Sequence, residues 1–337
     1  MAILTLREAF KKDLVESFLP ADPVRESPFW LSGAVRSDNR ISRLIASGSQ
    51  SFEVPYLNPI SAKLEPNYSN TIVTDIAVPN VINAGKMKGL MAYLNESWLE
   101  SHLETYLIGF EPLREIAKQI AGYWQEQTEE RLVATLVGLR NYDQGNGKKF
   151  TTEKAAVFSV QDFIQVEGTM ASKYRGKGAL VINPAVATQL RLAKLLIPFQ
   201  DPANLTVVET YNGRRVIEST NGTMTKTGAT VKYVSYFLNE GAFAGESVPD
   251  REDLELERTA ATGNGGGHTT LWTRRNMLIH PTGFSFVAES NTLTGGTKNE
   301  ALSASWSDLT KAANWKLEVD DQIVDKLPLR ILVNNAA

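Results

Sequence analysis

The chain has 337 residues, of which 22% are charged and 42% hydrophobic, and it carries a formal net charge of −3. This composition is typical of a globular protein with material for roughly two domains, and the mildly acidic balance argues against a nucleic-acid-binding protein, which is usually basic. The sequence has no cysteine, which excludes disulfides, thiolate metal sites and cysteine nucleophiles, and we expect neither a signal peptide nor a membrane helix, because no window approaches about 20 apolar residues.

The first segment of the chain is predicted to be an arm. Four apolar residues recur at every fourth position between charged ones, as on an amphipathic helix: Leu6, Phe10, Leu14 and Phe18. Prolines at positions 20, 23 and 28 then break the helix, and the aromatic pair Phe29-Trp30 follows. A helix, a proline-rich hinge and an exposed aromatic pair favour an arm, although a helix packed on its own domain fits equally well.

Residues 48–92 predict a long β-hairpin. Phe52, Val54 and Tyr56 alternate with polar residues, as in a half-buried strand. A polar tip over 63–70 follows, and the β-branched residues of 71–81 predict the return strand. Because a two-stranded hairpin is marginally stable on its own, we expect it to project from its subunit and pack on a neighbour.

The clearest predicted helix runs from Pro112 to Leu139, with proline at the first helical position. At about 1.5 Å per residue it forms a rod of roughly 42 Å, about twice the usual length. Gly122 and Gly138 each cost a helix about 1 kcal/mol relative to alanine, which indicates close packing by another backbone or a bend. One apolar stripe, centred on Trp124, is expected to pack on a sheet: Leu113, Ile116, Ile120, Trp124, Thr128, Leu132, Thr135 and Leu139.

After a glycine- and asparagine-rich linker at 141–149, short helices and strands follow without a βαβ rhythm, which predicts an α+β architecture. The Asn212-Gly213 pair predicts a tight hairpin turn, and glycine-rich segments at 262–267 and 294–297 predict flexible loops. We expect helices at 162–174 and 185–196, and strands at 179–182, 206–210, 214–219, 231–238, 271–280 and 284–287.

No residue pattern predicts a catalytic, cofactor-binding or metal-binding site. The three histidines, at 102, 268 and 280, lie far apart and form no HExxH motif. The glycine run at 263–267 lacks the Lys-Ser or Lys-Thr ending of a phosphate loop. A cluster of carboxylates has few apolar partners and is interpreted as a charged surface or interface: Asp250, Glu252, Asp253, Glu255 and Glu257.

Two pairs of adjacent arginines stand next to predicted strands, Arg214-Arg215 and Arg274-Arg275. Each pair is a candidate for phosphate contacts. In a chain of net charge −3, we expect intersubunit salt bridges instead.

Several short motifs occur in a characteristic order along the chain. They are Tyr123-Trp124, the Tyr211 to Ile217 strand pair, Phe237, Gly241-Ala242-Phe243, Gly245, Pro249, Arg251, Arg274-Arg275, His280-Pro281, Gly283, Asn299, Glu300, Leu302 and Ala312-Ala313-Asn314-Trp315. In this order they resemble the tailed-bacteriophage major capsid proteins of the Hong Kong ninety-seven-type fold. The resemblance extends from about residue 3 to 333.

The resemblance implies an α+β phage major capsid fold made of five parts. In chain order these are an N-terminal arm (1–47), an extended hairpin loop (48–92), a peripheral domain (93–154) with its spine helix at 110–142, an axial domain (155–285) and a return to the peripheral domain (286–337).

The same resemblance implies a structural protein, not an enzyme, that binds no cofactor. It would self-assemble through hexamers and pentamers in the host cytoplasm into the icosahedral head of the virion, around double-stranded DNA that it binds without sequence specificity. A portal and a decoration protein are expected partners. A separate scaffolding protein is also expected, because the arm begins almost at residue 1 and some relatives carry a scaffolding domain before it. No membrane is expected. Some relatives crosslink a hairpin lysine, for which Lys63, Lys86 and Lys88 are candidates by position only.

Two other functions stay open at this point. An encapsulin-like cellular nanocompartment shell has the same fold, and no sequence feature separates it from a phage head. A hydrolytic enzyme that uses the carboxylates at 250–258 would instead be a compact monomer or small oligomer with a pocket.

Overall fold

We analysed a computed structural model of the chain. It describes residues 27–38, 41, 43, 51–57, 65–79, 84–103, 112–157, 159–200, 207–227, 230–289, 292–295, 303–319 and 321–336. Most of the expected arm, the candidate Lys63 and the motif residues Asn299, Glu300 and Leu302 lie outside these ranges. In the described part of the arm, Phe29 is buried and not exposed as expected, because it packs into the main hydrophobic core. Within them, no helix is long and apolar enough to span a membrane.

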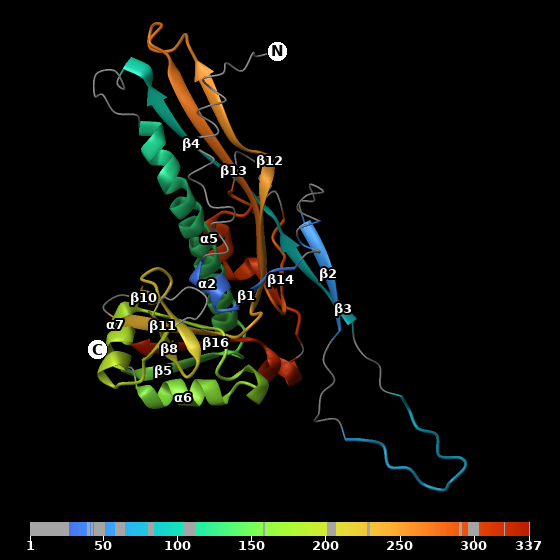
Figure 1. The fold of residues 1–337 in the computed structure, drawn as a ribbon. Helices are drawn as coiled ribbons and strands as arrows, with labels where there is room; N and C mark the ends of the chain where they lie inside the picture. Colours follow the sequence, from blue (N-terminus) through green and yellow to red (C-terminus); the bar gives the residue numbers. More distant parts are fainter. Residues whose placement is uncertain are drawn as a thin grey trace.

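One half of the molecule is an elongated, twisted sheet (Figure 1). Its two long central strands form a hairpin whose register runs from Phe243 opposite Pro281 to Thr259 opposite His268. The strand order is β1 (Val35–Arg36), β12 (Phe243–Thr259), β13 (His268–Pro281) and β4 (Ala92–Ser101). Alternate side chains of β13 are buried, because one face of the sheet is covered and the other is partly open.

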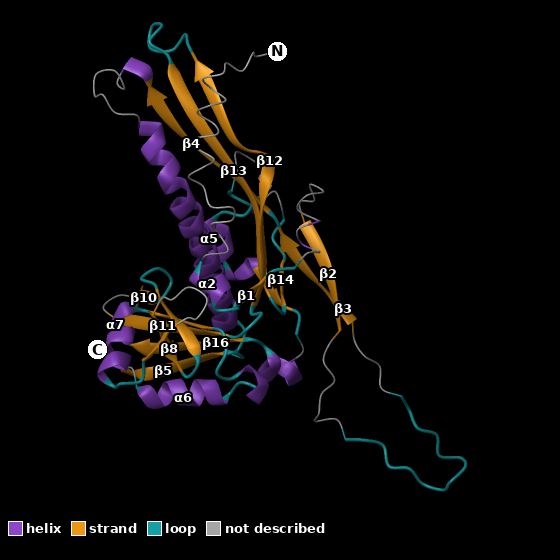
Figure 2. Cartoon of the chain, in the orientation of Figure 1, coloured by secondary structure: helices purple, strands orange, loops and turns teal. Residues whose placement is uncertain are grey.

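The other half is a compact sheet with two short helices on one face (Figure 2). Ser159 and Asn183 cap α6 (Val160–Gly168) and α7 (Pro184–Leu192) through their side chains, which satisfies backbone donors at each helix start. Its strand order is β5 (Thr151–Val157), β16 (Leu329–Asn335), β11 (Thr230–Leu238), β6 (Ala179–Ile182), β9 (Arg214–Glu218), β8 (Val207–Tyr211) and β7 (Ile197–Gln200), with β10 (Met224–Thr227) paired to β11.

The long helix α5 (Pro112–Gly145) joins the two halves. Its first half packs Ile120 and Trp124 against the elongated sheet, and its second half packs Leu132, Leu136 and Leu139 on the face of the compact sheet opposite α6 and α7. Trp124 is buried, and its indole N–H donates to the hydroxyl of Thr273 on β13 at 3.2 Å. The helix is confirmed, and it continues through residues 141–145, which we expected to be a linker.

Gly122 and Gly138 of α5 have different surroundings. A Cβ added at Gly138 would lie 2.0 Å from the carbonyl oxygen of Leu309 in α8 (Trp306–Thr310) and 2.5 Å from Nε1 of Trp315. At Gly122, by contrast, nothing lies within 4 Å of the added Cβ. Close packing by another backbone, one of the two expected reasons for a glycine, therefore applies to Gly138 only.

The predicted hairpin forms, but its return strand lies further along the chain. Strand β2 (Ser51–Leu57) pairs with β3 (Ala84–Leu90), from Ser51 opposite Leu90 to Leu57 opposite Ala84. Residues 71–79, within the predicted return strand, form no strand and are exposed. Their β-branched side chains favour extended backbone, yet the described subunit offers them no strand to pair with.

The strand pairing links segments that the expected division of the chain places in different parts. Strands β12 and β13 fall within 155–285, which the resemblance assigned to the axial domain, but they pair with β1 and β4. Strand β16 falls within 286–337, the expected return to the peripheral domain, but it is buried inside the compact sheet. Apolar patterning marks each strand as buried without showing which sheet it joins, because both sheets offer a buried face.

Other elements lie close to their predicted positions. Asn212 and Gly213 adopt the positive φ values of a tight turn between β8 and β9. The helix expected at 162–174 is shorter and ends at Gly168, followed by a single turn at 172–174. Thr294, in a segment expected to be flexible, is held by its backbone N–H, which donates to the buried Asp308 at 2.7 Å.

Candidate assembly surfaces

The histidines stabilise local structure. His102 contacts the hydroxyl of Thr269 at 2.6 Å. His280 is buried, packs edge-on against Phe52, and donates from Nε2 to the carbonyl of Phe284 at 2.7 Å. Burial lowers the pKa of His280 to about 4, in opposition to that hydrogen bond. No group of three or more metal-ligating side chains occurs within the described ranges.

One arginine of each pair, Arg214 and Arg274, binds within the subunit and not across an interface, contrary to expectation. Arg214 is fully buried, and its guanidinium donates to Glu167 at 3.3 Å and to the backbone carbonyls of Lys177, Leu238 and Tyr174. Arg274 donates to Glu255 on the paired strand at 2.7 Å. Both side chains therefore act within one subunit, since each already has an acidic partner there.

The carboxylate cluster lies on strand β12. Leu254 is buried and Leu256 packs beside it in the cluster that contains Trp124. Glu255 and Glu257 face the other way and bind partners on β13, with the indole N–H of Trp272 donating to Glu257 at 3.0 Å. These carboxylates belong to the charged face of a sheet, which matches the predicted charged surface; the side chains of Asp250 and Glu252 are not described.

The described loop of the hairpin, residues 65–79, is exposed throughout. It carries large apolar side chains that are 62–97% exposed, among them Ile72, Val73, Ile76 and Val78. Hydrogen bonds described for this loop are local, for example from Tyr68 to Glu65. Figure 1 shows this segment extending away from α5 and β4. A cluster of exposed apolar residues on a projecting segment is typical of a protein–protein contact.

The base of the hairpin is fixed to its own subunit. Phe52, Met91 and Leu278 form a small buried cluster with Ile41. The backbone N–H of Lys88 also donates to the hydroxyl of Ser285 at 3.0 Å. The loop is therefore carried on an anchored base, which the sequence pattern did not predict.

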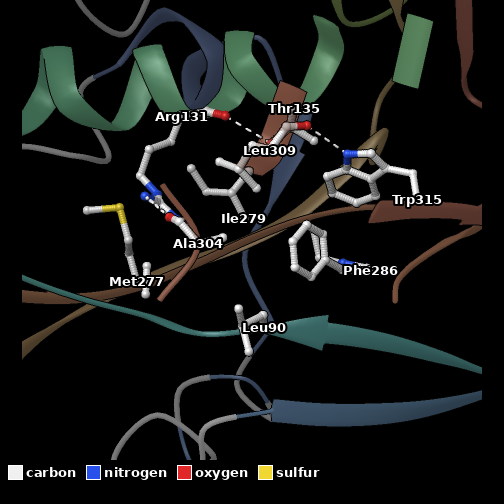
Figure 3. A pocket seen from close by; sticks show the side chains of 11 residues that line it. Leu90, Arg131, Thr135, Met277, Ile279, Phe286, Ala304, Leu309 and Trp315 are labelled. Carbon is white, nitrogen blue, oxygen red and sulfur yellow. Dashed lines mark hydrogen bonds between the residues drawn. The ribbon is translucent and has the colours of Figure 1, made fainter. Parts of the chain in front are cut away.

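A surface groove of about 470 Å³ lies between β4 and α8 and is lined by Tyr93, Leu94, Asn95, Arg131, Gly295 and residues 303–307. Arg131 also borders an internal cavity of about 20 Å³, room for about one water molecule. Figure 3 shows Arg131 pointing from α5 toward Ala304, whose carbonyl accepts a hydrogen bond at 3.0 Å. Burial lowers the pKa of Arg131 to about 10.

A second groove, of about 450 Å³, runs between α5 and β4 around the exposed Gly122. Its apolar lining comes from Trp98, Ile116, Ile120 and Tyr123. Neither groove gathers a nucleophile, a general base and a stabilising donor, the combination that an active site needs. Both are surfaces on which another chain can pack.

The chain is similar in sequence to a phage capsid protein. No protein-family model matches the chain. It is 23% identical over 325 residues to the major capsid protein of Bacillus phage SPP1, a match that covers 95% of each chain.

Solved phage heads have the same fold. The head structure of Helicobacter pylori bacteriophage KHP40 matches with a TM-score of 0.53 and 10% identity over 94% of this chain and 92% of that one. The capsid of cyanophage Pam1 matches with a TM-score of 0.52 and 9% identity over 90% and 88%. The chain therefore has the capsid fold of tailed bacteriophages and is a relative of their major capsid proteins.

Proposed function

We propose that this chain is the major capsid protein of a phage head, which self-assembles into the icosahedral shell of the virion around double-stranded DNA. The observation that carries the proposal is the match to a major capsid protein over 95% of both chains, in a molecule with the capsid fold. The comparisons favour this function over an encapsulin-like nanocompartment. Two of the carboxylates that a hydrolase would use, Glu255 and Glu257, bind Arg274 and Trp272 within the subunit, and we propose no catalytic role.

The subunit would assemble through hexamers and pentamers. The compact sheet with α6 and α7 would serve as the axial part, and the elongated sheet with α5 and α8 as the peripheral part. The hairpin loop would reach a neighbouring subunit, because its apolar residues are exposed in its own and lose contact with water when a neighbour covers them. A scaffolding protein, a portal and a decoration protein would act on the assembled lattice.

Polar substitution of the loop tests this role. We expect the triple variant Ile72→Ser, Val73→Ser, Ile76→Ser to fold with an unchanged urea midpoint, because these side chains make no buried contacts in the subunit. Shell formation, measured by sedimentation, should fail. The matched control changes Thr71 and Thr74 of the same loop to serine and should leave shells intact. Normal shells from the triple variant would remove the loop from the assembly mechanism.

A further inference from the structure

Arg131 is a buried cation that lacks an anionic partner in the described part of the chain. The residue is only 9% exposed, and the hydrogen bond that the structure gives its guanidinium goes to the neutral carbonyl of Ala304. An ion held away from water costs several kcal/mol unless a counter-charge and further hydrogen bonds compensate. A carboxylate supplied from outside the subunit would provide both.

The groove above Arg131 fits an extended peptide better than a small anion. Its walls are apolar at Leu94, Ala304 and Trp306, and Trp306 is 44% exposed at the rim. Asn95 and Ser307 add polar groups to the lining. The nearby carboxylate of Asp308 does not serve Arg131, since it accepts hydrogen bonds from Thr294, Ser305 and Lys311. The complementary ligand is therefore an extended apolar segment with one carboxylate.

The exposed loop has this composition. Asp75 stands between Ile72-Val73 and Ile76, all exposed, and its carboxylate accepts a hydrogen bond from the side chain of Asn70 within the loop. The loop extends away from β4 and α5 of its own subunit (Figure 1), and these elements contribute to the groove. A loop that occupies this groove must therefore come from a second copy.

We propose that the groove between β4 and α8 is a carboxylate-binding site that receives residues 72–76 of a second copy, with Asp75 paired to Arg131. The proposal rests on the proposed shell function and adds the receiving site for the loop. The apolar residues of the loop exclude water from the groove, which strengthens the charged hydrogen bond between the two side chains.

Cysteine crosslinking tests the contact directly, because the chain has no cysteine of its own. The variant with Thr74→Cys and Ser307→Cys keeps Asp75 and Arg131. After oxidation, its shells should give covalent multimers on a non-reducing denaturing gel that collapse to monomer with reductant, since a disulfide needs Cα atoms within about 7 Å. The matched control pairs Thr74→Cys with Lys226→Cys on β10, which is exposed and does not line the groove, and should stay monomeric on the gel.

The charge pair is tested by the subunit concentration at which shells first form. Asp75→Asn and Arg131→Met should each raise this concentration about tenfold. The double variant should raise it no further than the larger single effect, because the two substitutions remove the same interaction. Arg131→Met should still fold, since an apolar side chain of similar size is tolerated in place of a buried charge. Glu300→Gln, an acidic residue close to Ser303 in sequence, is the matched control and should have no effect.

The outcomes separate this inference from the proposed function. Shells of the Thr74→Cys, Ser307→Cys variant that form normally but do not crosslink would overturn the groove assignment and leave the shell function standing. Additive effects of the two charge variants, or an effect of Glu300→Gln equal to that of Asp75→Asn, would do the same. A wild-type chain that forms no shells would overturn the shell function, and the groove assignment with it.

Discussion

The contact between α5 and α8 at Gly138 makes a quantitative prediction. In an exposed helix position, alanine would stabilise the fold by about 1 kcal/mol relative to glycine. Here the new Cβ would lie 2.0 Å from the backbone oxygen of Leu309, and backbone cannot move aside as a flexible side chain can. Overpacking costs about 1–3 kcal/mol. Displacing α8 also breaks the 2.8 Å hydrogen bond from the indole of Trp315 to Leu309, at about 1–3 kcal/mol.

Together these terms predict that Gly138→Ala lowers the free energy of unfolding by about 1–5 kcal/mol. Urea unfolding of the unassembled subunit, followed by tryptophan fluorescence, measures this change. Gly122→Ala is the matched control in the same helix, and it should raise the free energy of unfolding by about 1 kcal/mol. Equal stabilisation by both substitutions would refute the packing argument.

Three further predictions concern buried side chains. Trp124→Ala should cost about 3–5 kcal/mol in urea unfolding, and a cost below about 1 kcal/mol would show that the helix does not depend on its contact with β13. Arg214→Ala leaves Glu167 buried without its cation and should cost about 3–5 kcal/mol, whereas the control Arg215→Ala should stay within about 0.5 kcal/mol. Because the pKa of His280 is lowered to about 4, the unfolded chain binds a proton at this histidine before the folded chain does, and the free energy of unfolding should fall as pH drops from about 6.5 toward 4. His280→Gln should flatten this part of the plot of unfolding free energy against pH. An unchanged slope would contradict the buried, neutral state of His280.

The sequence patterns predicted those helices and turns whose formation depends on residues close together in the chain. The stripe around Trp124 predicted a helix that packs on a sheet, and Asn212-Gly213 predicted a hairpin turn, because a helix face and a tight turn depend on neighbours within a few residues. The same reasoning missed β12. Leu254 and Leu256 alternate with Glu255 and Glu257, the period of a strand, but the density of charge favoured a surface interpretation.

The candidate surfaces depend on contacts between distant parts of the chain. Nothing near Arg131 in the sequence shows that residues 303–307 cover it, so its burial could not be predicted from the helix pattern. The contact of Arg214 was mispredicted for the same reason, since its partner Glu167 lies on α6, far from it in the sequence. The position of the return strand of the hairpin is likewise fixed by its anchored base, where Phe52 lies against Gly89.

Electron microscopy of the purified chain tests the central claim most directly. The account predicts closed shells built from rings of five and six subunits, and a polar-loop variant that stays unassembled although folded. A chain that remains a compact monomer or small oligomer under the conditions in which its relatives assemble would contradict the account.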